Sequence, residues 1–394
     1  MAYSRASSYA VATNAKPKQC RAPDHQSLPS EVNLRSTRES RGVTDENVIQ
    51  SLLEYIRSTT ARRGLAYAET PTRMSGGFDA TILGFSLRGA PEPFSGPLVL
   101  RLFQADADGR RAPREAAIQN ALAELGYPAP RVLVAEERTE ALGGAFLIME
   151  RMPGRPLGWE AEALRIKGVG QVLNMLRRLP CIRREILRLW KDAQTSLHSL
   201  PVADFVASVE RAGFSGRDFN FNSYFASLRA ATAELSLEGL RPAIDWLIVH
   251  EPRRLQAPVI CHGDFQPFNV LAHNGRLTGV IDWVKVTIAE PAFDYGAVIA
   301  ILATVPIRAP AGLHQLLRAL MNSLSRTHSG PCRSLPGSEA ALRYYQIFNC
   351  VVQLITVARN RAQGRNTHGV YNSRVGVANL INHVHRLTWL QVNL

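Results

Sequence analysis

The stretch Cys261-His-Gly-Asp-Phe-Gln-Pro-Phe-Asn-Val-Leu271 decides how the rest of the chain is interpreted. It places Asp264 and Asn269 on one loop between two short apolar runs. Ile281-Asp-Trp283 follows further along and adds a second aspartate, Asp282, after an apolar pair. Oxygen-bearing side chains that recur at the ends of neighbouring strands indicate a site built to bind or react.

These three side chains fit the chemistry of phosphoryl transfer. A carboxylate must accept the proton of the attacking hydroxyl, and oxygen ligands must hold the magnesium ion that neutralises the triphosphate. We expect Asp264 to be the catalytic base, and Asn269 and Asp282 to be the Mg²⁺ ligands. The alternative interpretation is that the aspartate and asparagine of the loop only stabilise a turn between two strands.

The flanking sequence predicts a small antiparallel sheet followed by a larger helical region. Apolar runs predict strands at Thr81–Leu87, Leu98–Phe103, Arg131–Ala135 and Ala145–Met149. One main helix is predicted at Pro113–Gly126, where the proline suits the first helical position and the glycine suits the end. From about residue 155 onward the apolar residues mostly follow a helical period. We therefore expect the α+β class and a two-lobed protein-kinase-like fold. Its predicted parts are a disordered tail (1–42), a nucleotide-binding lobe (43–152) and a catalytic and substrate-binding helical lobe (153–394).

At the loop residues the chain resembles the aminoglycoside phosphotransferase family, kinase-like enzymes that phosphorylate small hydroxylated molecules. The motif is His262-Gly-Asp-x-x-x-x-Asn269, where protein kinases usually have His-Arg-Asp-x-x-x-x-Asn. Glu290-Pro-Ala-Phe-Asp294 is similar to the family's Asp-Pro-x-x-Asp segment, with Glu290 in place of the first Asp. The resemblance implies that Asp294 braces the catalytic loop.

A cation and a carboxylate in the N-terminal region fit the same chemistry. Arg101 lies in an apolar strand, where its charge can hold the α- and β-phosphates, and Glu115 lies in the first turn of the next helix. Such a pair orients the phosphates in kinases, usually with lysine on the strand. Solvated charges are the alternative, because Arg110 and Arg114 lie close by in the sequence.

Two further segments are candidates for binding the nucleotide, ATP or GTP. Ser75, Gly76 and Gly77 resemble the family's short nucleotide loop, whose glycines let backbone N–H groups approach phosphate, although a Gly-Gly hairpin is also an ordinary turn. The backbone at Glu150 to Met152 is the expected hinge that hydrogen-bonds the purine. A buried strand leading into a turn is compatible with that role.

Two histidines are expected to have structural roles. We expect His262 to order the catalytic loop through hydrogen bonds rather than to move protons. His198 ends an amphipathic helix and is interpreted as a packing or surface residue.

Charge and composition indicate which partners and which compartment to expect. The net charge of +13 comes from scattered arginines, only five of the 46 basic residues are lysines, and no nucleic-acid motif occurs, so we expect no nucleic-acid partner. The longest apolar stretch, Ala297–Ile307, falls short of the roughly 18 residues of a membrane span, so we expect no membrane partner. The five cysteines form no CxxC pair and no apolar leader follows the N-terminus, which favours a cytoplasmic protein.

The charge of the C-terminal region bears on the acceptor. From Ala297 to Leu394 the only acidic residue is Glu339, against ten arginines. Because aminoglycosides are polycations, this favours a neutral or anionic hydroxylated acceptor, such as a macrolide-like lactone, a sugar or a hydroxy acid. An aminoglycoside kinase is the alternative within the family, and a non-catalytic nucleotide-binding module is the alternative from another class.

Overall fold

The computed structural model describes most of the chain. The described residues are 45–74, 80–103, 110–157, 169–254, 256–307, 309, 311–364 and 370–394. The predicted nucleotide loop at Ser75, Gly76 and Gly77 and the predicted tail at 1–42 lie outside them. Residues 43–394 belong to one compact unit.

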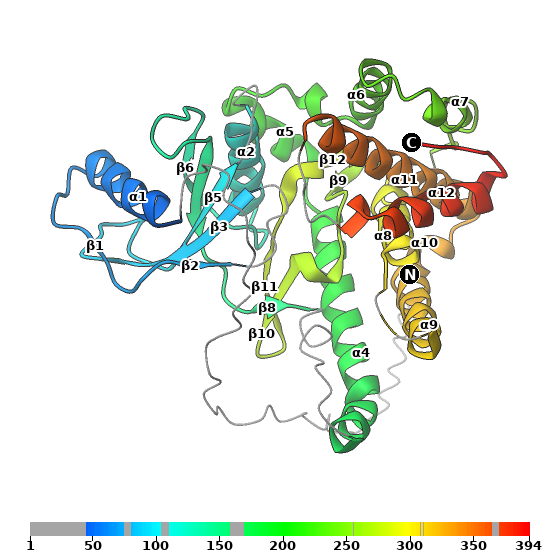
Figure 1. Ribbon diagram of the computed structural model, residues 1–394, viewed down its shortest axis with the longest axis horizontal. Helices are drawn as coiled ribbons and strands as arrows, with labels where there is room; N and C mark the ends of the chain where they lie inside the picture. The colour runs from blue at the N-terminus through cyan, green and yellow to red at the C-terminus, as the bar shows by residue number, and fades with distance from the viewer. Residues whose placement is uncertain are drawn as a thin grey trace, which may run out of the picture. The chain divides into compact units, whose positions relative to one another are not determined.

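A five-stranded antiparallel sheet forms the N-terminal part of this unit, as predicted (Figure 1). Its order is β2-β3-β5-β7-β6, with a separate two-stranded pair of β1 and β4. The strands are β1 (Ala66–Tyr67), β2 (Thr72–Arg73), β3 (Ala80–Phe85), β4 (Leu87–Arg88), β5 (Leu98–Phe103), β6 (Val132–Glu136) and β7 (Phe146–Glu150).

Two helices cover the two faces of this sheet. Alternate residues of a strand point to opposite faces, so each strand contributes to two apolar layers. Leu100 and Ile148 pack with the buried side of α1 (Asp45–Thr59). Phe103 and Leu147 pack on the other face with alanines of α2 (Arg111–Glu124). The sheet is thereby packed on both faces, and its central strand β5 carries Arg101.

Helix α2 begins two residues earlier than predicted. The sequence favours Pro113 as the first helical residue, but the helix starts at Arg111. Proline is compatible with the whole first turn, because the N–H groups there have no intrahelical acceptor. The predicted face is retained: Glu115 and Ile118 are both buried.

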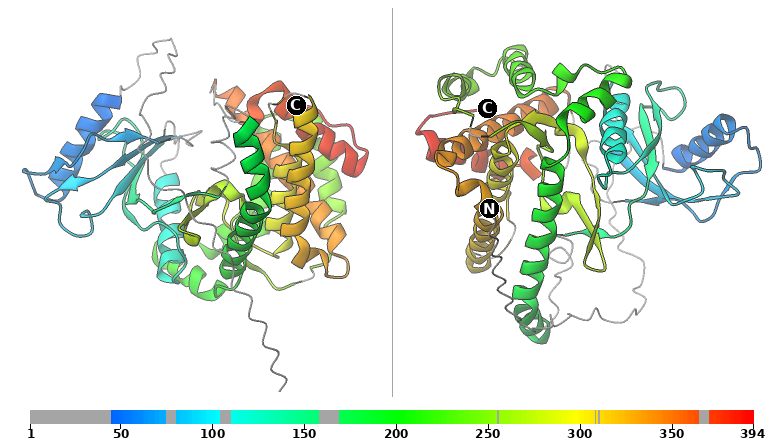
Figure 2. Two further views of the ribbon diagram at one scale, coloured as in Figure 1. Left: turned by 90° about the horizontal axis from the view of Figure 1, so that it is seen from below. Right: turned by 180° about the vertical axis from the view of Figure 1, so that it is seen from behind.

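The C-terminal part is mainly helical, as predicted. Figures 1 and 2 show its long helices gathered side by side, and Arg183 of α4 donates a hydrogen bond to Thr327 of α9 at 3.0 Å. The helices are α4 (Val169–His198), α5 (Val202–Arg211), α6 (Phe221–Glu234), α7 (Arg241–Val249), α8 (Ala292–Thr304), α9 (Ala311–His328), α10 (Gly330–Arg333), α11 (Ser338–Ala362) and α12 (Arg374–Thr388). Short 3-10 turns are η1 (Gly216–Phe219), η2 (Glu238–Leu240), η3 (Pro267–Asn269), η4 (Trp283–Lys285) and η5 (Val370–Asn372).

Helix α8 is central to this part of the molecule. Nearly all of its residues are buried, which matches its almost wholly apolar sequence. It packs against α11, α9 and α12. Its first turn carries Asp294, so a buried helix delivers this carboxylate to the catalytic loop.

Two small sheets frame the catalytic loop. β9 (Val259–Cys261) pairs with β12 (Thr287–Ala289), and β10 (Val270–His273) pairs with both β8 (Arg155–Pro156) and β11 (Arg276–Val280). The β10–β11 hairpin turns through Asn274-Gly275, both with positive φ, as a two-residue hairpin with this sequence requires. The loop from His262 to Asn269 is therefore held at both ends by strands.

Candidate active site

The predicted loop residues lie close together. The Asn269 side-chain amide donates a hydrogen bond to the Asp264 carbonyl at 2.9 Å, and the Ile281 N–H donates to the Asn269 carbonyl at 2.9 Å. The second contact joins the catalytic loop to the segment that carries Asp282. Asp264, Asn269 and the segment of Asp282 are thus linked by hydrogen bonds to backbone carbonyls.

Asp282 connects this loop to the N-terminal sheet. Its backbone is left-handed, with φ of 68°, a conformation that aspartate tolerates better than most residues. Arg101 of β5 places Nη2 3.3 Å from Asp282 Oδ1 and Nη1 2.5 Å from Glu115 Oε1 of α2. The structure therefore brings together all three of these predicted site residues, and the close competitors Arg110 and Arg114 are not the partners of this contact.

Lys285 is a residue of this site that the sequence reasoning missed. Its Nζ lies 3.2 Å from Asp264 Oδ2, and both side chains are largely buried. Burial lowers the pKa of the Lys285 ammonium, but the Asp264 carboxylate together with Tyr224 and Asp282 outweighs that effect, and the pKa is raised overall. The ammonium therefore stays charged beside the candidate base.

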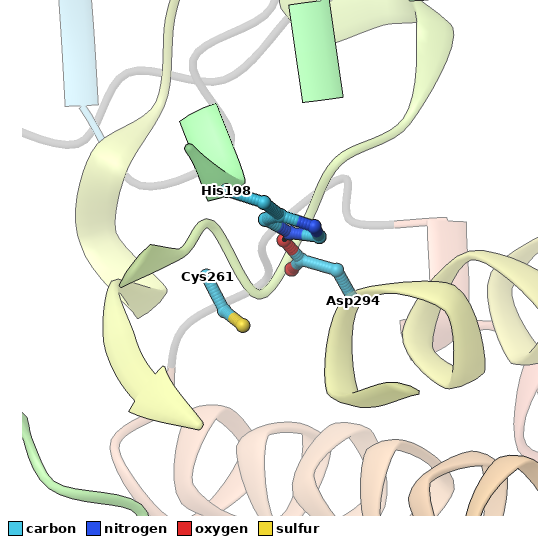
Figure 3. Close-up of side chains that lie close together, drawn as sticks. All are labelled: His198, Cys261 and Asp294. Atoms are coloured by element: carbon cyan, nitrogen blue, oxygen red, sulfur yellow. Dashed lines mark hydrogen bonds and ion pairs between the residues drawn. The ribbon is translucent and has the colours of Figure 1, made fainter. Parts of the chain in front are cut away.

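Asp294 braces the catalytic loop, as the resemblance implies. Its Oδ1 accepts a hydrogen bond from the Gly263 N–H at 2.7 Å, and its Oδ2 accepts one from the His262 N–H at 3.1 Å. His198 adds a third contact, with Nε2 2.9 Å from Oδ2 (Figure 3). Burial raises the pKa of Asp294, yet these hydrogen bonds outweigh it, so the pKa is lowered and the carboxylate is ionised.

His198 is a packing residue, as one of the two expected roles proposed, but it also has a polar partner that the sequence did not indicate. Its side chain is 10% exposed and binds the Asp294 carboxylate. Because an ionised carboxylate only accepts hydrogen bonds, Nε2 carries the proton. This histidine is the last residue of helix α4. The amphipathic pattern of the helix does not indicate a polar partner 96 residues away.

The structural role expected of His262 is confirmed. Its Nε2 lies 3.0 Å from the Ile281 carbonyl, and its Nδ1 lies 3.2 Å from the Asp264 N–H. A carbonyl accepts and an N–H donates, so the ring is neutral, with its proton on Nε2. The imidazole thus connects two loops, and both of its ring nitrogens take part in these contacts.

The cluster of His198, Cys261 and Asp294 is not a convincing metal centre. The three ligand atoms lie within 4.8 Å of one another (Figure 3). Both Asp294 oxygens already accept backbone hydrogen bonds, however, and the Cys261 thiol lies 3.6 Å from the Ala289 and Glu290 carbonyls. Burial raises the pKa of Cys261 well above its usual range, so the sulfur is a thiol, whereas metals bind the thiolate.

Asn269 and Asp282 fit a hard divalent cation. Because the Asn269 amide nitrogen donates to the loop, its Oδ1 faces away and accepts no hydrogen bond from a described residue. The Asp282 side chain is 43% exposed and therefore reachable by a ligand. Carboxylate and amide oxygens are the donors that Mg²⁺ prefers. The predicted pair is chemically suited to that ion.

The hinge residues differ in what they can offer a purine. The Glu150 N–H donates to the Arg131 carbonyl at 2.9 Å, and the Arg151 N–H donates to the Pro97 carbonyl at 2.9 Å. Those two donors are used within the sheet. No hydrogen bond joins the Met152 N–H to another described residue, so Met152 is the position with a donor to spare.

Several arginines of the C-terminal helices have structural partners. Arg318 donates hydrogen bonds to the Leu302 and Ala303 carbonyls, at 2.9 and 2.8 Å, at the end of α8. Arg343 stacks on Trp246, with 5.5 Å from its guanidinium carbon to the ring centroid. The sequence count therefore overstates the positive charge available to an acceptor.

The cations nearest to Asp264 come from other segments. Lys285 contacts it directly, and Arg114 of α2 places Nη1 3.3 Å from the Val284 carbonyl, next to that lysine in the chain. Tyr224 of α6 lies within electrostatic reach of all three and also of Arg359 of α11. Burial raises the pKa of this phenol, which therefore keeps its proton.

A family model and several curated proteins match parts of this chain. The model of the phosphotransferase enzyme family (APH) matches residues 88–324. Among curated proteins, the chain is 26% identical over 183 residues to acyl-CoA dehydrogenase family member 11 of Pongo abelii. It is 28% identical over 186 residues to acyl-CoA dehydrogenase family member 10 of Mus musculus. Each match covers 46% of this chain but only 22% and 16% of those proteins.

Solved structures share the fold. A thermostable mutant of aminoglycoside phosphotransferase APH(4)-Ia, in a ternary complex with ADP and hygromycin B, has a TM-score of 0.57 at 16% identity. The match covers 86% of this chain and 99% of that one. Its counterpart with AMP-PNP and hygromycin B also gives 0.57, at 17% identity, covering 86% and 98%. The kinase-like α+β fold is thus confirmed, and because the family model spans more than half of the chain, the chain belongs to the phosphotransferase enzyme family.

Proposed function

We propose that this chain moves the γ-phosphoryl group of ATP or GTP to a hydroxyl of a small molecule, with Mg²⁺ as cofactor. The observation that carries the proposal is the contact of Arg101 with both Glu115 and Asp282, next to the loop of Asp264 and Asn269. One site then holds a phosphate-binding cation, two metal-binding oxygens and a base. Phosphoryl transfer depends on this combination, because positioning and charge stabilisation supply most of the catalysis.

Each residue has a distinct role in the proposed reaction. Asp264 accepts the proton of the acceptor hydroxyl, and its Oδ1 has no hydrogen-bond partner among the described residues. Glu115 fixes the Arg101 guanidinium, which holds the α- and β-phosphates. Asn269 and Asp282 would hold Mg²⁺, which neutralises charge on the phosphates when bound.

The nucleotide base and the phosphates have further candidate contacts. The backbone from Glu150 to Met152 would hydrogen-bond the purine, with the carbonyl of Glu150 as acceptor and the N–H of Met152 as donor. Ser75, Gly76 and Gly77 would approach the phosphates through backbone N–H groups. Both assignments follow from the family resemblance and the position of β7 next to β5.

For the acceptor, we propose a neutral or anionic hydroxylated molecule. Lys285 and Arg114 place positive charge around the base, which suits a neutral or anionic compound better than a polycation. An aminoglycoside acceptor is the alternative, as in the hygromycin B complex of the structural relative. A non-catalytic nucleotide-binding module is the second alternative, and it leaves the buried Arg101–Glu115 contact without a catalytic purpose.

The compartment is part of the proposal. Cys261, Cys332 and Cys350 are buried and free in the described part of the chain, and this suits the reducing cytoplasm. In the described part of the chain no helix is long and apolar enough to cross a membrane.

The test is a transfer assay with unbiased acceptors. The protein is incubated with Mg²⁺, ATP or GTP, and a mixture of sugars, hydroxy acids, macrolides and aminoglycosides, and products are identified by the mass of one added phosphoryl group. We expect a neutral or anionic product that Asp264→Ala does not form. Nucleotide binding without hydrolysis or transfer to any acceptor would favour the non-catalytic module.

A further inference from the structure

Lys285 lies directly against the candidate base. Its Nζ is 3.2 Å from Asp264 Oδ2, and the two side chains are 23% and 16% exposed. The pair is thus mostly removed from water but still open to a ligand. The ammonium makes no other hydrogen bond to a described residue, so two of its three N–H donors remain for a substrate.

The backbone fixes this lysine relative to the base. Strands β9 and β12 pair with Cys261 opposite Thr287, and Asp264 and Lys285 lie just beyond that pair on the two segments. The catalytic loop also packs closely on the lysine. A side chain at Gly263 would place its Cβ 2.6 Å from the Lys285 carbonyl oxygen. The backbone position of Lys285 is therefore fixed relative to the loop, while its side chain can still turn.

We infer that Lys285 is a further catalytic residue that donates hydrogen bonds to the phosphoryl group during transfer, an inference that rests on the proposed function. The acceptor oxygen must lie within about 2.6–3.2 Å of an Asp264 oxygen to lose its proton there. The phosphorus that it attacks then lies on the same side of the loop as the ammonium. Lys285 can turn from Asp264 Oδ2 to a phosphoryl oxygen without leaving the site.

Lys285 is the described cation that directly contacts the candidate base. Residues 262–269 of the loop contain neither lysine nor arginine, and Arg101 points to Asp282 on the metal-binding side. The Arg114 guanidinium is held by the Val284 carbonyl and lies over the Phe219 ring at 4.8 Å. Among these cations, Lys285 is therefore the one best placed to meet developing charge on the phosphoryl oxygens near the acceptor.

The step balances without further reactants. The acceptor O–H gives its proton to the Asp264 carboxylate, and the acceptor oxygen forms a bond to the γ-phosphorus. The bond from that phosphorus to the β–γ bridging oxygen breaks, and the nucleoside diphosphate leaves with the electron pair. Lys285 keeps its protons throughout and stabilises the three phosphoryl oxygens.

The experiment compares Lys285→Met, Lys285→Gln and Lys285→Arg with Lys191→Met, a control lysine on α4 outside the site. ADP and AMP-PNP binding is measured by calorimetry with Mg²⁺, and ATP hydrolysis in water gives kcat and KM. For Lys285→Met and Lys285→Gln we expect kcat to fall by about 10²-fold. We also expect AMP-PNP affinity to fall about tenfold while ADP affinity stays the same, because only AMP-PNP carries the terminal phosphoryl group.

The variants separate this role from a purely structural one. Lys285→Arg keeps a cation and should recover at least a tenth of wild-type kcat, whereas Lys191→Met should match the wild type. Equal loss of ADP and AMP-PNP affinity, or kcat within twofold of wild type for Lys285→Met, overturns the role of Lys285 alone. A wild-type protein that binds nucleotide but turns over none, with any acceptor, overturns the proposed function and this role with it.

Discussion

Two carboxylates near the catalytic loop show how differently one region can use the same chemical group. Asp294 is fully buried and accepts hydrogen bonds from His198 and from two backbone N–H groups. Asp264 contacts one movable cation, Lys285, and its second oxygen has no hydrogen-bond partner among the described residues. A carboxylate whose capacity is filled holds structure, and one whose capacity is left open is available to a substrate.

Replacement of the open carboxylate should have the largest effect on activity. Asp264→Ala removes the proton acceptor and the ion-pair partner of Lys285, whose side chain is 23% exposed and can still reach water. We expect turnover to fall by about 10²–10⁴-fold, while the melting temperature and nucleotide affinity change little. Turnover is measured as nucleotide-dependent phosphorylation, with binding by calorimetry. Activity within a fewfold of wild type would contradict the assignment of Asp264 as the base.

Replacement of the filled carboxylate should instead break the fold. Asp294→Ala leaves the buried N–H groups of His262 and Gly263 without acceptors and leaves His198 without its partner. Such losses cost about 3–5 kcal/mol, and we expect the free energy of unfolding in urea to fall by that amount. The matched control is Asp192→Ala, an exposed carboxylate on α4. Equal stability of the two variants would remove the distinction between filled and open groups.

We expect low pH to reduce the free energy of unfolding through His328, the last residue of α9. His328 is buried, stacks on Trp190 with ring centroids 3.6 Å apart, and burial lowers its pKa to about 3. The unfolded chain binds a proton near pH 6.5, so stability from this group is present above pH 6.5 and is lost as pH falls toward 3. Between pH 7 and 5 we expect a loss of about 2 kcal/mol.

Urea unfolding at several pH values measures this loss. His328→Phe keeps a ring against Trp190 without a titrating group, so its stability should depend less steeply on pH over the same window. Identical slopes for wild type and variant would show that His328 does not carry the effect. His383, whose pKa burial lowers to about 4, would then be the next residue to replace.

The metal-binding side should show the smallest of these effects. Asp282→Asn retains a polar side chain but loses a charged oxygen ligand, which a hard divalent cation prefers. We expect AMP-PNP affinity to fall about tenfold with Mg²⁺ present and to change little without it, which corresponds to about 1.4 kcal/mol. Calorimetry with and without EDTA measures both values. The same Mg²⁺ dependence in mutant and wild type would exclude Asp282 as a ligand.

The sequence predicted the sheet, the helical region and the loop because each has a local signal. The apolar run Leu98–Phe103 matches β5 to the residue, since a strand buried on both faces has few alternatives. The spacing of Asp264, Asn269 and Asp282 predicted their proximity, because strands lie on either side of the loop. The pairing of Arg101 with Glu115 was predicted from their positions alone, because one lies in a strand and the other in the next helix.

The partners of these residues carried a weaker signal. His198 lies 96 residues from Asp294, and a helical pattern says nothing of a polar contact across that separation. Lys285 offered a clue: it is one of only five lysines among 46 basic residues, and it follows Asp282 by three positions. Contacts that depend on tertiary packing, rather than on local pattern, were the ones that the sequence could not provide.

The close packing at Gly263 has a consequence for which sequences this loop can accept. Its φ is +77°, and a Cβ added there would lie 2.6 Å from the Lys285 carbonyl oxygen, which leaves no room for a side chain. The arginine that protein kinases carry in the corresponding His-Arg-Asp motif therefore cannot be introduced here without displacing the lysine segment. In a saturation library selected for folding, we expect position 263 to remain glycine, while the exposed Phe268 five residues later drifts freely. The glycine that distinguishes this motif from that of protein kinases is thus a requirement of the packing between the catalytic loop and the segment of Lys285.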